Sequence, residues 1–384
     1  MKKIYFDNAA TTPVERRVLE TMYEFSREFF GNPSSVHSYG RKVKVKLEEA
    51  REICASFINA DVSEIYFTSG GTEANNFIVR GVSQTLSEDY NVSNIFSTEG
   101  EHPSVSESLK YLERLGIEYF LLKLNSDSSL NLNELSNVKN ENSFFSVIHT
   151  NNETGAKNDL TKIVQKLKKR NIIIHTDAVQ AFGKEMIDVQ KLNVDALSAS
   201  AHKIGGPKGT GLAYVKNGTP ISQLIFGGSQ ERNRRGGTEN IAGIIGFAEA
   251  VKIAEKEMNV NSVHVNNLKN VFSKELKNIF GDDVSFNGGN DSSPYILSVT
   301  FNPEIYKNDA EAMLMFFDVN GIALSAGSAC SSGTLKPSHV ITAARRNEEE
   351  AKSTLRISFG KENKLEEIDY ALEIFLKFKN RFAR

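Results

Sequence analysis

Between residues 64 and 215, short apolar runs alternate with segments whose apolar residues recur every three or four positions. Runs that are apolar on both faces predict strands covered on both sides, and the intervening segments predict the covering helices. This order is typical of an α/β protein with a mostly parallel sheet. The predicted strands are 64–67, 94–97, 145–149, 172–175, 196–200 and 212–215. The predicted helices are 41–58, a segment following Thr72, 159–169 and 242–258.

The pattern changes near residue 260, where a long helical segment is followed by fewer and more widely spaced strands. This change predicts a second, smaller α+β domain, and 384 residues are enough for two or three domains. The predicted elements are helix 262–280, strand 295–301, helix 308–319, a Gly/Ser/Ala-rich loop at 325–334, strand 353–358 and helix 364–378.

Composition excludes several classes of protein. The formal net charge is −2, so the chain lacks the basic excess that favours binding to nucleic acids or membrane surfaces. Two cysteines cannot form a four-cysteine zinc site, and we predict no bound metal. The N-terminal residues lack the apolar stretch of a signal peptide, and no run approaches the roughly 20 apolar residues of a membrane helix. We therefore expect a cytoplasmic protein.

Two segments at predicted strand ends carry residues suited to a phosphate-bearing cofactor. The segment 68–73 contains Gly71 and Thr72 and opens a helix, where glycine and free amides favour a bound anion; an ordinary strand-to-helix turn explains it equally well. After strand 172–175, Asp177 and Gln180 lie at the sheet edge where ligands of open α/β sheets bind. Asp177 could pair with a protonated ring nitrogen, or cap the next helix.

A third segment, 199–209, ends a predicted strand with His202 and Lys203 and continues into a glycine-rich turn. A lysine in a tight, partly desolvated turn can lose its proton and form a Schiff base, whereas most lysines are solvated, as we expect for Lys208. Pyridoxal phosphate requires a phosphate cup, an acidic partner for its ring nitrogen and a reactive lysine. The three segments supply these groups in that order.

The loop 325–334 surrounds Cys330 with small residues. A structural cysteine normally lies among bulky apolar neighbours, as Cys54 does within its helical pattern. We therefore predict that Cys330 is an exposed, reactive nucleophile and that Cys54 is structural.

These features occur together in the cysteine desulfurases of the class V pyridoxal-phosphate-dependent aminotransferases, and the chain resembles that family over nearly its whole length. The stretch around Cys330 resembles the group with the longer catalytic loop, because the short Arg-x-Gly-His-His-Cys pattern of the other group is absent. The motifs that carry the resemblance are 5–13, 31–35, 101–103, 151–155, 177–180, 200–203, 236–240, 327–331 and 355–358.

The resemblance implies the type I fold of pyridoxal-phosphate transferases, with a mostly parallel seven-stranded sheet flanked by helices. It implies an N-terminal arm at 1–15 associated with the small domain, a large cofactor-binding domain at 16–258 and a small domain at 259–384. One departure is Arg345, at a position where the family often has glycine. Because arginine disfavours positive φ, we expect a local adjustment there.

The resemblance also implies a role for each matching residue. Lys203 would bind the cofactor covalently and later move the substrate's Cα proton, Cys330 would accept the sulfur, and His102 would stack on the ring and act as an acid/base. Thr238 would reach the cofactor of a neighbouring subunit, which implies a homodimer. The other cofactor contacts would come from Gly71, Thr72, Asn152, Asp177, Gln180, Ser200 and His202. The substrate carboxylate would be bound by Asn32 and Arg356, and Asn152 would also help to position the substrate.

The implied activity is removal of sulfur from L-cysteine, giving L-alanine and a persulfide on Cys330. The sulfur would then pass to an acceptor protein for iron–sulfur cluster assembly or tRNA thiolation. A selenocysteine lyase or another class V enzyme would share the fold, and a scaffold without activity would share the surface. A zinc hydrolase built on His175, Asp177 and His202 is a further alternative, although we interpret His175 as structural.

Overall fold

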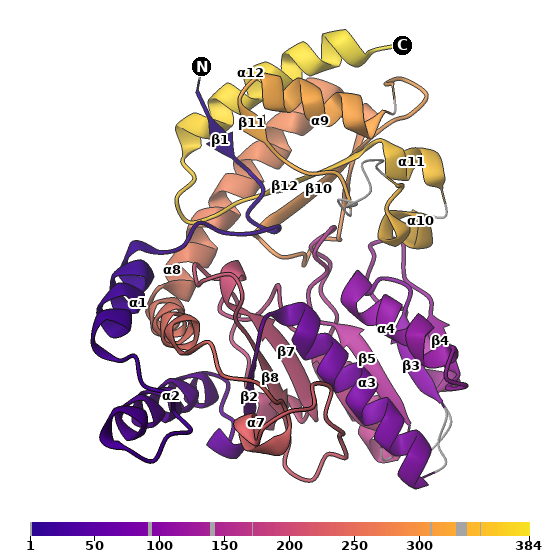
Figure 1. Ribbon diagram of the computed structural model, residues 1–384. Helices are drawn as coiled ribbons and strands as arrows, with labels where there is room; N and C mark the ends of the chain where they lie inside the picture. The colour runs from indigo at the N-terminus through magenta and orange to yellow at the C-terminus, as the bar shows by residue number, and fades with distance from the viewer. Residues whose placement is uncertain are drawn as a thin grey trace.

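A seven-stranded sheet forms the centre of the lower part of the molecule in Figure 1. The structure is a computed structural model that describes residues 2–90, 94–138, 143–170, 172–307, 309–327, 336–345 and 347–384. The strand order is β2-β8-β7-β6-β5-β3-β4; β8 is antiparallel to both neighbours, and the other neighbouring pairs are parallel. This confirms the predicted fold class. The strands are β2 (Ile65–Thr68), β3 (Ile95–Thr98), β4 (Tyr119–Leu122), β5 (Phe144–Ile148), β6 (Ile173–Asp177), β7 (Ala196–Ser200) and β8 (Gly211–Val215).

Helices cover both faces of this sheet because successive strand residues point to opposite sides. Phe144 packs in the cluster that contains the apolar residues of α3 and α4. Its neighbour Phe145 packs in the cluster on the other face, with residues of α2, α5 and the first part of α8. The bounds of these helices are α2 (Ser38–Phe57), α3 (Gly71–Tyr90), α4 (Pro103–Glu113), α5 (Leu160–Leu167) and α8 (Ile241–Phe280).

A second, three-stranded antiparallel sheet with the order β12-β10-β9 lies in the upper part of the molecule (Figure 1). Aromatic residues of its strands and helices form a separate core. The N-terminal strand β1 pairs with β11, and Phe6 is buried in this same core. The elements are β1 (Ile4–Tyr5), β9 (Val284–Asn287), β10 (Ile296–Phe301), α9 (Ala310–Val319), β11 (Ile322–Ala323), β12 (Thr354–Ser358) and α12 (Leu365–Phe382).

The predicted strands are confirmed, with ends that shift by at most two residues. The two helices predicted at 242–258 and 262–280 form one continuous helix, α8, so that division was wrong. The boundary predicted between the large domain (16–258) and the small domain (259–384) falls inside α8. The division into these domains stays a prediction. The remaining elements are α1 (Arg16–Glu28), α6 (Val189–Leu192), α7 (Gln230–Asn233), α10 (His339–Arg345), α11 (Glu348–Lys352), η1 (Val62–Glu64), η2 (Glu134–Asn137), η3 (Lys168–Arg170), η4 (Ala201–Lys203) and η5 (Gly281–Asp283).

Arg345 is the last residue of α10 and is not among the residues with positive φ in the described part of the chain. Its guanidinium donates to Asn287 Oδ1 on β9, at 3.2 Å from Nε and 3.0 Å from Nη2. The adjustment expected for a replaced glycine therefore does not take the form of backbone strain at Arg345.

Candidate active site

A cavity of about 350 Å³ lies where the carboxyl ends of β5, β6 and β7 meet the start of α3 and the strand β12. Parallel strands deliver their last residues to one edge of a sheet, which explains why distant motifs converge here. Most residues predicted for the cofactor and substrate line this cavity. They are Gly71, Thr72, His102, Asn152, Asp177, Gln180, Ser200, His202, Lys203 and Arg356.

Two of the predicted residues that the structure describes do not line the cavity. Asn32 and Thr238 are both exposed and lie elsewhere in this single chain. Cys330 lies outside the described residues, as does the part of its loop from 328 to 335. At the start of that loop, Ser325 and Gly327 do line the cavity.

Lys203 ends the turn η4, which directly follows β7. Its Nζ donates to the carbonyl oxygens of Ala9 at 2.6 Å and Ala10 at 2.7 Å. Burial and the nearby Arg356 guanidinium lower the pKa of Lys203 to about 8, so a large fraction of the amine is neutral near that pH. Lys208, predicted to be a solvated loop residue, is exposed.

Asp177 is the last residue of β6 and is buried. Its Oδ2 accepts from Asn75 Nδ2 at 2.7 Å, and its Oδ1 accepts from the Val179 amide at 3.0 Å. The carboxylate is therefore held on two sides while it lines the cavity. Sequence reasoning missed Asn75, which lies near the start of α3 and is 1% exposed.

Gln180 is fixed by contacts at both ends of its amide. Its Nε2 donates to the Ala9 carbonyl at 2.8 Å, and its Oε1 accepts from Lys184 Nζ at 3.1 Å. Lys184 is buried, and burial followed by the charge of Lys203 lowers the pKa of Lys184 to about 7. Sequence reasoning also missed Lys184, which lies 4 positions after Gln180 in the sequence.

The start of α3 offers groups that fit a phosphate. Backbone amides of a first helical turn favour an anion, and a Cβ at Gly71 would lie 2.6 Å from Val179 Cγ2, so the backbone there is closely approached. The Ser200 hydroxyl is buried at this edge and has no hydrogen-bond partner among the described residues. His202 also lines the cavity, and burial followed by the charge of Lys203 lowers its pKa to about 4.

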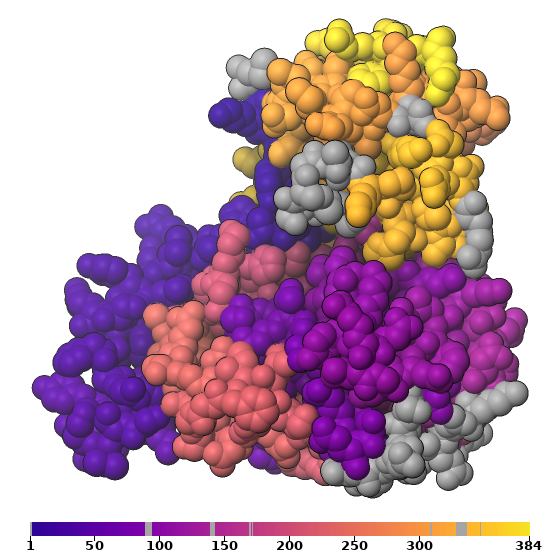
Figure 2. All heavy atoms as spheres, turned by 45° about the vertical axis from the view of Figure 1, so that its right-hand side comes forward, coloured from indigo at the N-terminus to yellow at the C-terminus, as the bar shows by residue number. Residues whose placement is uncertain are grey.

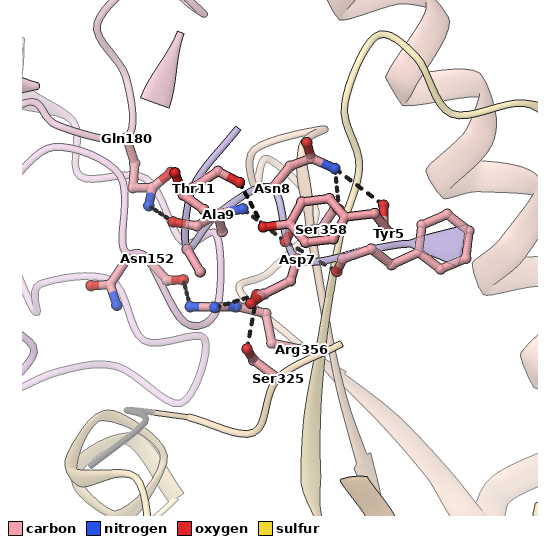
Figure 3. Close-up of polar contacts among 12 residues, drawn as sticks. Tyr5, Asp7, Asn8, Ala9, Thr11, Asn152, Gln180, Ser325, Arg356 and Ser358 are labelled. Carbon is pink, nitrogen blue, oxygen red and sulfur yellow. Dashed lines mark hydrogen bonds and ion pairs between the residues drawn. The ribbon is translucent and has the colours of Figure 1, made fainter. Parts of the chain in front are cut away.

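Arg356 approaches the cavity from β12 (Figure 3). Its Nη1 donates to the Asn152 carbonyl at 2.9 Å, and its Nη2 pairs with Asp7 Oδ1 at 2.8 Å. The same Asp7 oxygen accepts from Ser325 Oγ at 2.8 Å, as Figure 3 shows. The buried Arg356 Nε has no partner within the described ranges. Asp7 belongs to the motif 5–13, but its pairing with Arg356 was not predicted.

His102 precedes α4 and lines the cavity. Its Nδ1 lies 3.1 Å from the Ser104 amide nitrogen and 2.7 Å from Ser104 Oγ. Burial is the main cause that lowers the pKa of His102, and this favours the neutral form of the ring.

A lysine whose pKa is lowered to about 8, a buried carboxylate and an anion site with an unpartnered hydroxyl together fit pyridoxal phosphate. Among the described residues, no group of three or more His, Cys, Asp and Glu side chains is placed to hold a metal ion. Both ring nitrogens of His175 contact serine hydroxyls, those of Ser146 and Ser198. Within the residues that the structure describes, no helix is long and apolar enough to cross a membrane.

Comparison with known proteins gives one consistent result. The family model for aminotransferase class-V matches residues 4–371. The cysteine desulfurase IscS of Dictyoglomus turgidum is 39% identical over 374 residues, which cover 97% of this chain and 93% of the relative. A solved NifS-like protein matches with a TM-score of 0.90 and 35% identity, covering 99% of this chain and 100% of that one. Solved SspA in complex with cysteine matches with a TM-score of 0.78 and 31% identity, covering 93% and 99%. The chain therefore belongs to the class V aminotransferase family and, within it, to the cysteine desulfurases.

Proposed function

We propose that this chain removes sulfur from L-cysteine with bound pyridoxal phosphate and passes the sulfur through Cys330 to an acceptor protein. The observation that carries the proposal is the convergence of Lys203, Asp177 and Arg356 on one cavity. Enzymes of this family use pyridoxal phosphate, and a solved relative was determined in complex with cysteine. Iron–sulfur assembly or tRNA thiolation would consume the sulfur, and we place the reaction in the cytoplasm.

When bound, pyridoxal phosphate would supply an electron sink for the electron pair released at the substrate Cα. The Asp177 carboxylate would keep the ring nitrogen protonated, because a buried anion favours the charged form of its neighbour. Gln180 would bond the ring oxygen, and Gly71, Thr72, Ser200 and His202 would hold the phosphate. Lys203, with a pKa lowered to about 8, would hold the cofactor and then accept the Cα proton as a neutral amine.

Substrate would be oriented by its carboxylate. Arg356 lines the cavity with a guanidinium that Asp7 and Asn152 hold in place, and the planar fork of a guanidinium suits a carboxylate. Asn152, whose carbonyl accepts from Arg356, would set the distance between this guanidinium and the ring. Asn32 is proposed as a further carboxylate ligand, and Thr238 as a ligand of the neighbouring subunit's cofactor in a homodimer.

Sulfur transfer needs a thiolate at Cys330. The thiolate sulfur would attack the substrate sulfur as the carbon–sulfur bond breaks, and the electron pair of that bond would remain with the substrate carbon, which becomes alanine after protonation. Cys54 is not suited to this step, since burial raises the pKa of its thiol to about 12.

The test compares three variants of the cofactor-loaded protein. Lys203→Ala should abolish the borohydride-reducible link to the cofactor. Cys330→Ala should keep the bound cofactor but lose release of sulfide from cysteine in the presence of a thiol reductant. The matched control, Cys54→Ala, should retain sulfide release. Sulfide and alanine formation by Cys330→Ala at the wild-type rate would overturn the proposed route, and a wild-type protein that forms alanine only from selenocysteine would make it a selenocysteine lyase.

A further inference from the structure

A chain of buried hydrogen bonds joins Asp177 to His102 through two side chains that the proposed function does not use. Asn75 Nδ2 donates to Asp177 Oδ2 at 2.7 Å and to Ser104 Oγ at 2.8 Å. Ser104 Oγ in turn lies 2.7 Å from His102 Nδ1. These residues come from β6, α3 and the start of α4, so the tertiary structure alone brings them together.

The direction of each bond can be assigned, beginning at the carboxylate. An ionised Asp177 only accepts, so the amide nitrogen of Asn75, and not its oxygen, faces it. The opposite end agrees, because the Ser198 hydroxyl donates to Asn75 Oδ1. Ser198 Oγ can then accept from His175 Nε2, 3.0 Å away. The Asp177 contact therefore sets the orientation of the Asn75 amide, and the Ser198 contact is compatible with it.

The assignment continues to the ring of His102. Because Ser104 Oγ accepts from Asn75, its own proton can be donated to His102 Nδ1. The Ser104 backbone N–H also donates to this nitrogen at 3.1 Å, and a backbone amide has no other role available to it. Nδ1 thus accepts from two donors and has no place for a proton of its own.

We propose that Asn75 and Ser104 are positioning residues, which hold the neutral ring of His102 in the tautomer that carries its proton on Nε2. Nε2 is the nitrogen turned away from Ser104, and among the described residues it makes no hydrogen bond that would occupy it. His102 would therefore offer a bound molecule an N–H donor, and the Cα proton would be left to Lys203. This inference rests on the proposed function and defines the state in which His102 takes part.

The surroundings of His102 bear on its protonation from four sides. Asp177 and Glu153 favour a charged ring, whereas Lys203 and His339 disfavour it. Protonation of Nδ1 would also set its proton against the Ser104 backbone N–H, which can only donate. Burial lowers the pKa of His102 in the same direction as the Ser104 contacts.

The tautomer can be measured on cofactor-free protein by two-bond ¹⁵N–¹H NMR of labelled histidine, with His102→Gln to identify the signals. We expect the wild type to show a protonated Nε2 and a bare Nδ1. Ser104→Ala removes one donor to Nδ1 and should raise the pKa of His102 by about half a unit to one unit, the equivalent of one neutral hydrogen bond. Ser104→Thr keeps the hydroxyl and should restore the wild-type value.

Ser108→Ala is the matched control, because Ser108 Oγ donates to the Ser104 carbonyl on the same helix and does not touch His102. It should leave the ring unchanged. In the cofactor-loaded enzyme, catalysis would require the neutral ring of His102, so a raised pKa of this ring moves the acidic limb of the kcat/KM profile for cysteine to higher pH. We expect this shift in Ser104→Ala and not in Ser104→Thr or Ser108→Ala.

A proton on Nδ1 in the wild type would overturn the proposal, as would a Ser104→Ala ring that titrates like the wild type. The NMR result does not depend on catalysis. A wild type that releases no sulfide from cysteine would remove the proposed function and leave the assigned tautomer standing.

Discussion

The Lys203 side chain shows how one buried amine controls cofactor capture. Its pKa is lowered from the ordinary 10.5 to about 8, first by burial and then by the positive charge of Arg356. A lowered lysine pKa means that the reactive neutral amine becomes abundant above pH 8 and not only above 10.5. We predict that the rate of pyridoxal phosphate uptake by the cofactor-free protein rises with pH to a plateau, with its midpoint near 8. Stopped-flow absorbance across that range measures it.

Two variants bound this prediction. Arg356→Gln removes a nearby positive charge and should move the midpoint of the uptake profile to higher pH. Lys208→Gln removes an exposed lysine of the same turn and should leave the profile where it was. A wild-type rate that still increases steeply far above pH 8 would contradict the lowered pKa.

For single residues, the sequence predicts site residues at the ends of strands well. It predicts poorly the residues that hold those site residues in place by hydrogen bonds. Lys203 and Asp177 stand at strand ends within recognisable motifs, and the structure places both at one cavity. Ser104, whose contacts with His102 span only two positions, was not predicted as a site residue. Asn75 and Asp7 were not predicted either, because their importance comes from hydrogen bonds across 29 or more positions of sequence. No local pattern of residue types predicts such pairings.

Among the elements, the short segment α7 contains three residues with an unfavourable backbone conformation. Glu231, Arg232 and Asn233 have φ values of 42°, 55° and 60°, and a left-handed conformation costs about 1–2 kcal/mol per residue that is not glycine. Arg51 on α2 holds this turn in place with two contacts to Glu231, at 2.7 and 2.8 Å. Glu231 also accepts from the Phe67 amide of β2 at 2.8 Å.

We predict that Glu231→Gln lowers the free energy of unfolding by about 3 kcal/mol, because it leaves the buried Arg51 with only the partly exposed carboxylate of Glu48, 3.3 Å from its Nε, as a charged partner. Urea unfolding at fixed protein concentration measures the change. The control is Glu20→Gln, which breaks the exposed pair with Arg16 and should change stability by no more than about 0.5 kcal/mol. Equal effects of the two substitutions would show that the α7 turn does not depend on the ion pair.

The spacing of apolar residues predicted most of the long elements. It failed where polar residues interrupt the apolar pattern of a helix and where a strand is exposed at the edge of the sheet. The break expected near residue 260 does not exist, because Asn259, Val260 and Asn261 reduce the apolar pattern without a proline or glycine to end the helix. Strand β4 was missed because it lies at the sheet edge and exposes Phe120 and Leu121, unlike a strand buried on both faces.

For the whole molecule, the open question is how two chains would meet. Phe30 is 77% exposed beyond the end of α1, and its ring contacts that of Tyr39 at the start of α2 in a tilted arrangement. This part of the chain projects to the left in Figure 2. The adjoining residues Pro33 and Val36 line a groove together with residues of the segment 229–239. That segment contains Thr238, the residue proposed to reach a neighbouring cofactor.

We predict that Phe30 and Val36 are buried in a homodimer, and that the double substitution Phe30→Asp/Val36→Asp weakens dimerisation by more than about a hundredfold. Each new carboxylate would have to leave water without a partner, at a cost of several kcal/mol, and every 1.4 kcal/mol is a tenfold change in Kd. Analytical ultracentrifugation would show monomers at concentrations where the wild type is dimeric. Because Thr238 would then be lost from the opposite site, cofactor affinity should fall together with dimerisation.

Met315→Asp on α9, an equally apolar and exposed position elsewhere, should remain dimeric. A double variant that stays dimeric with full cofactor affinity would place the interface on another surface.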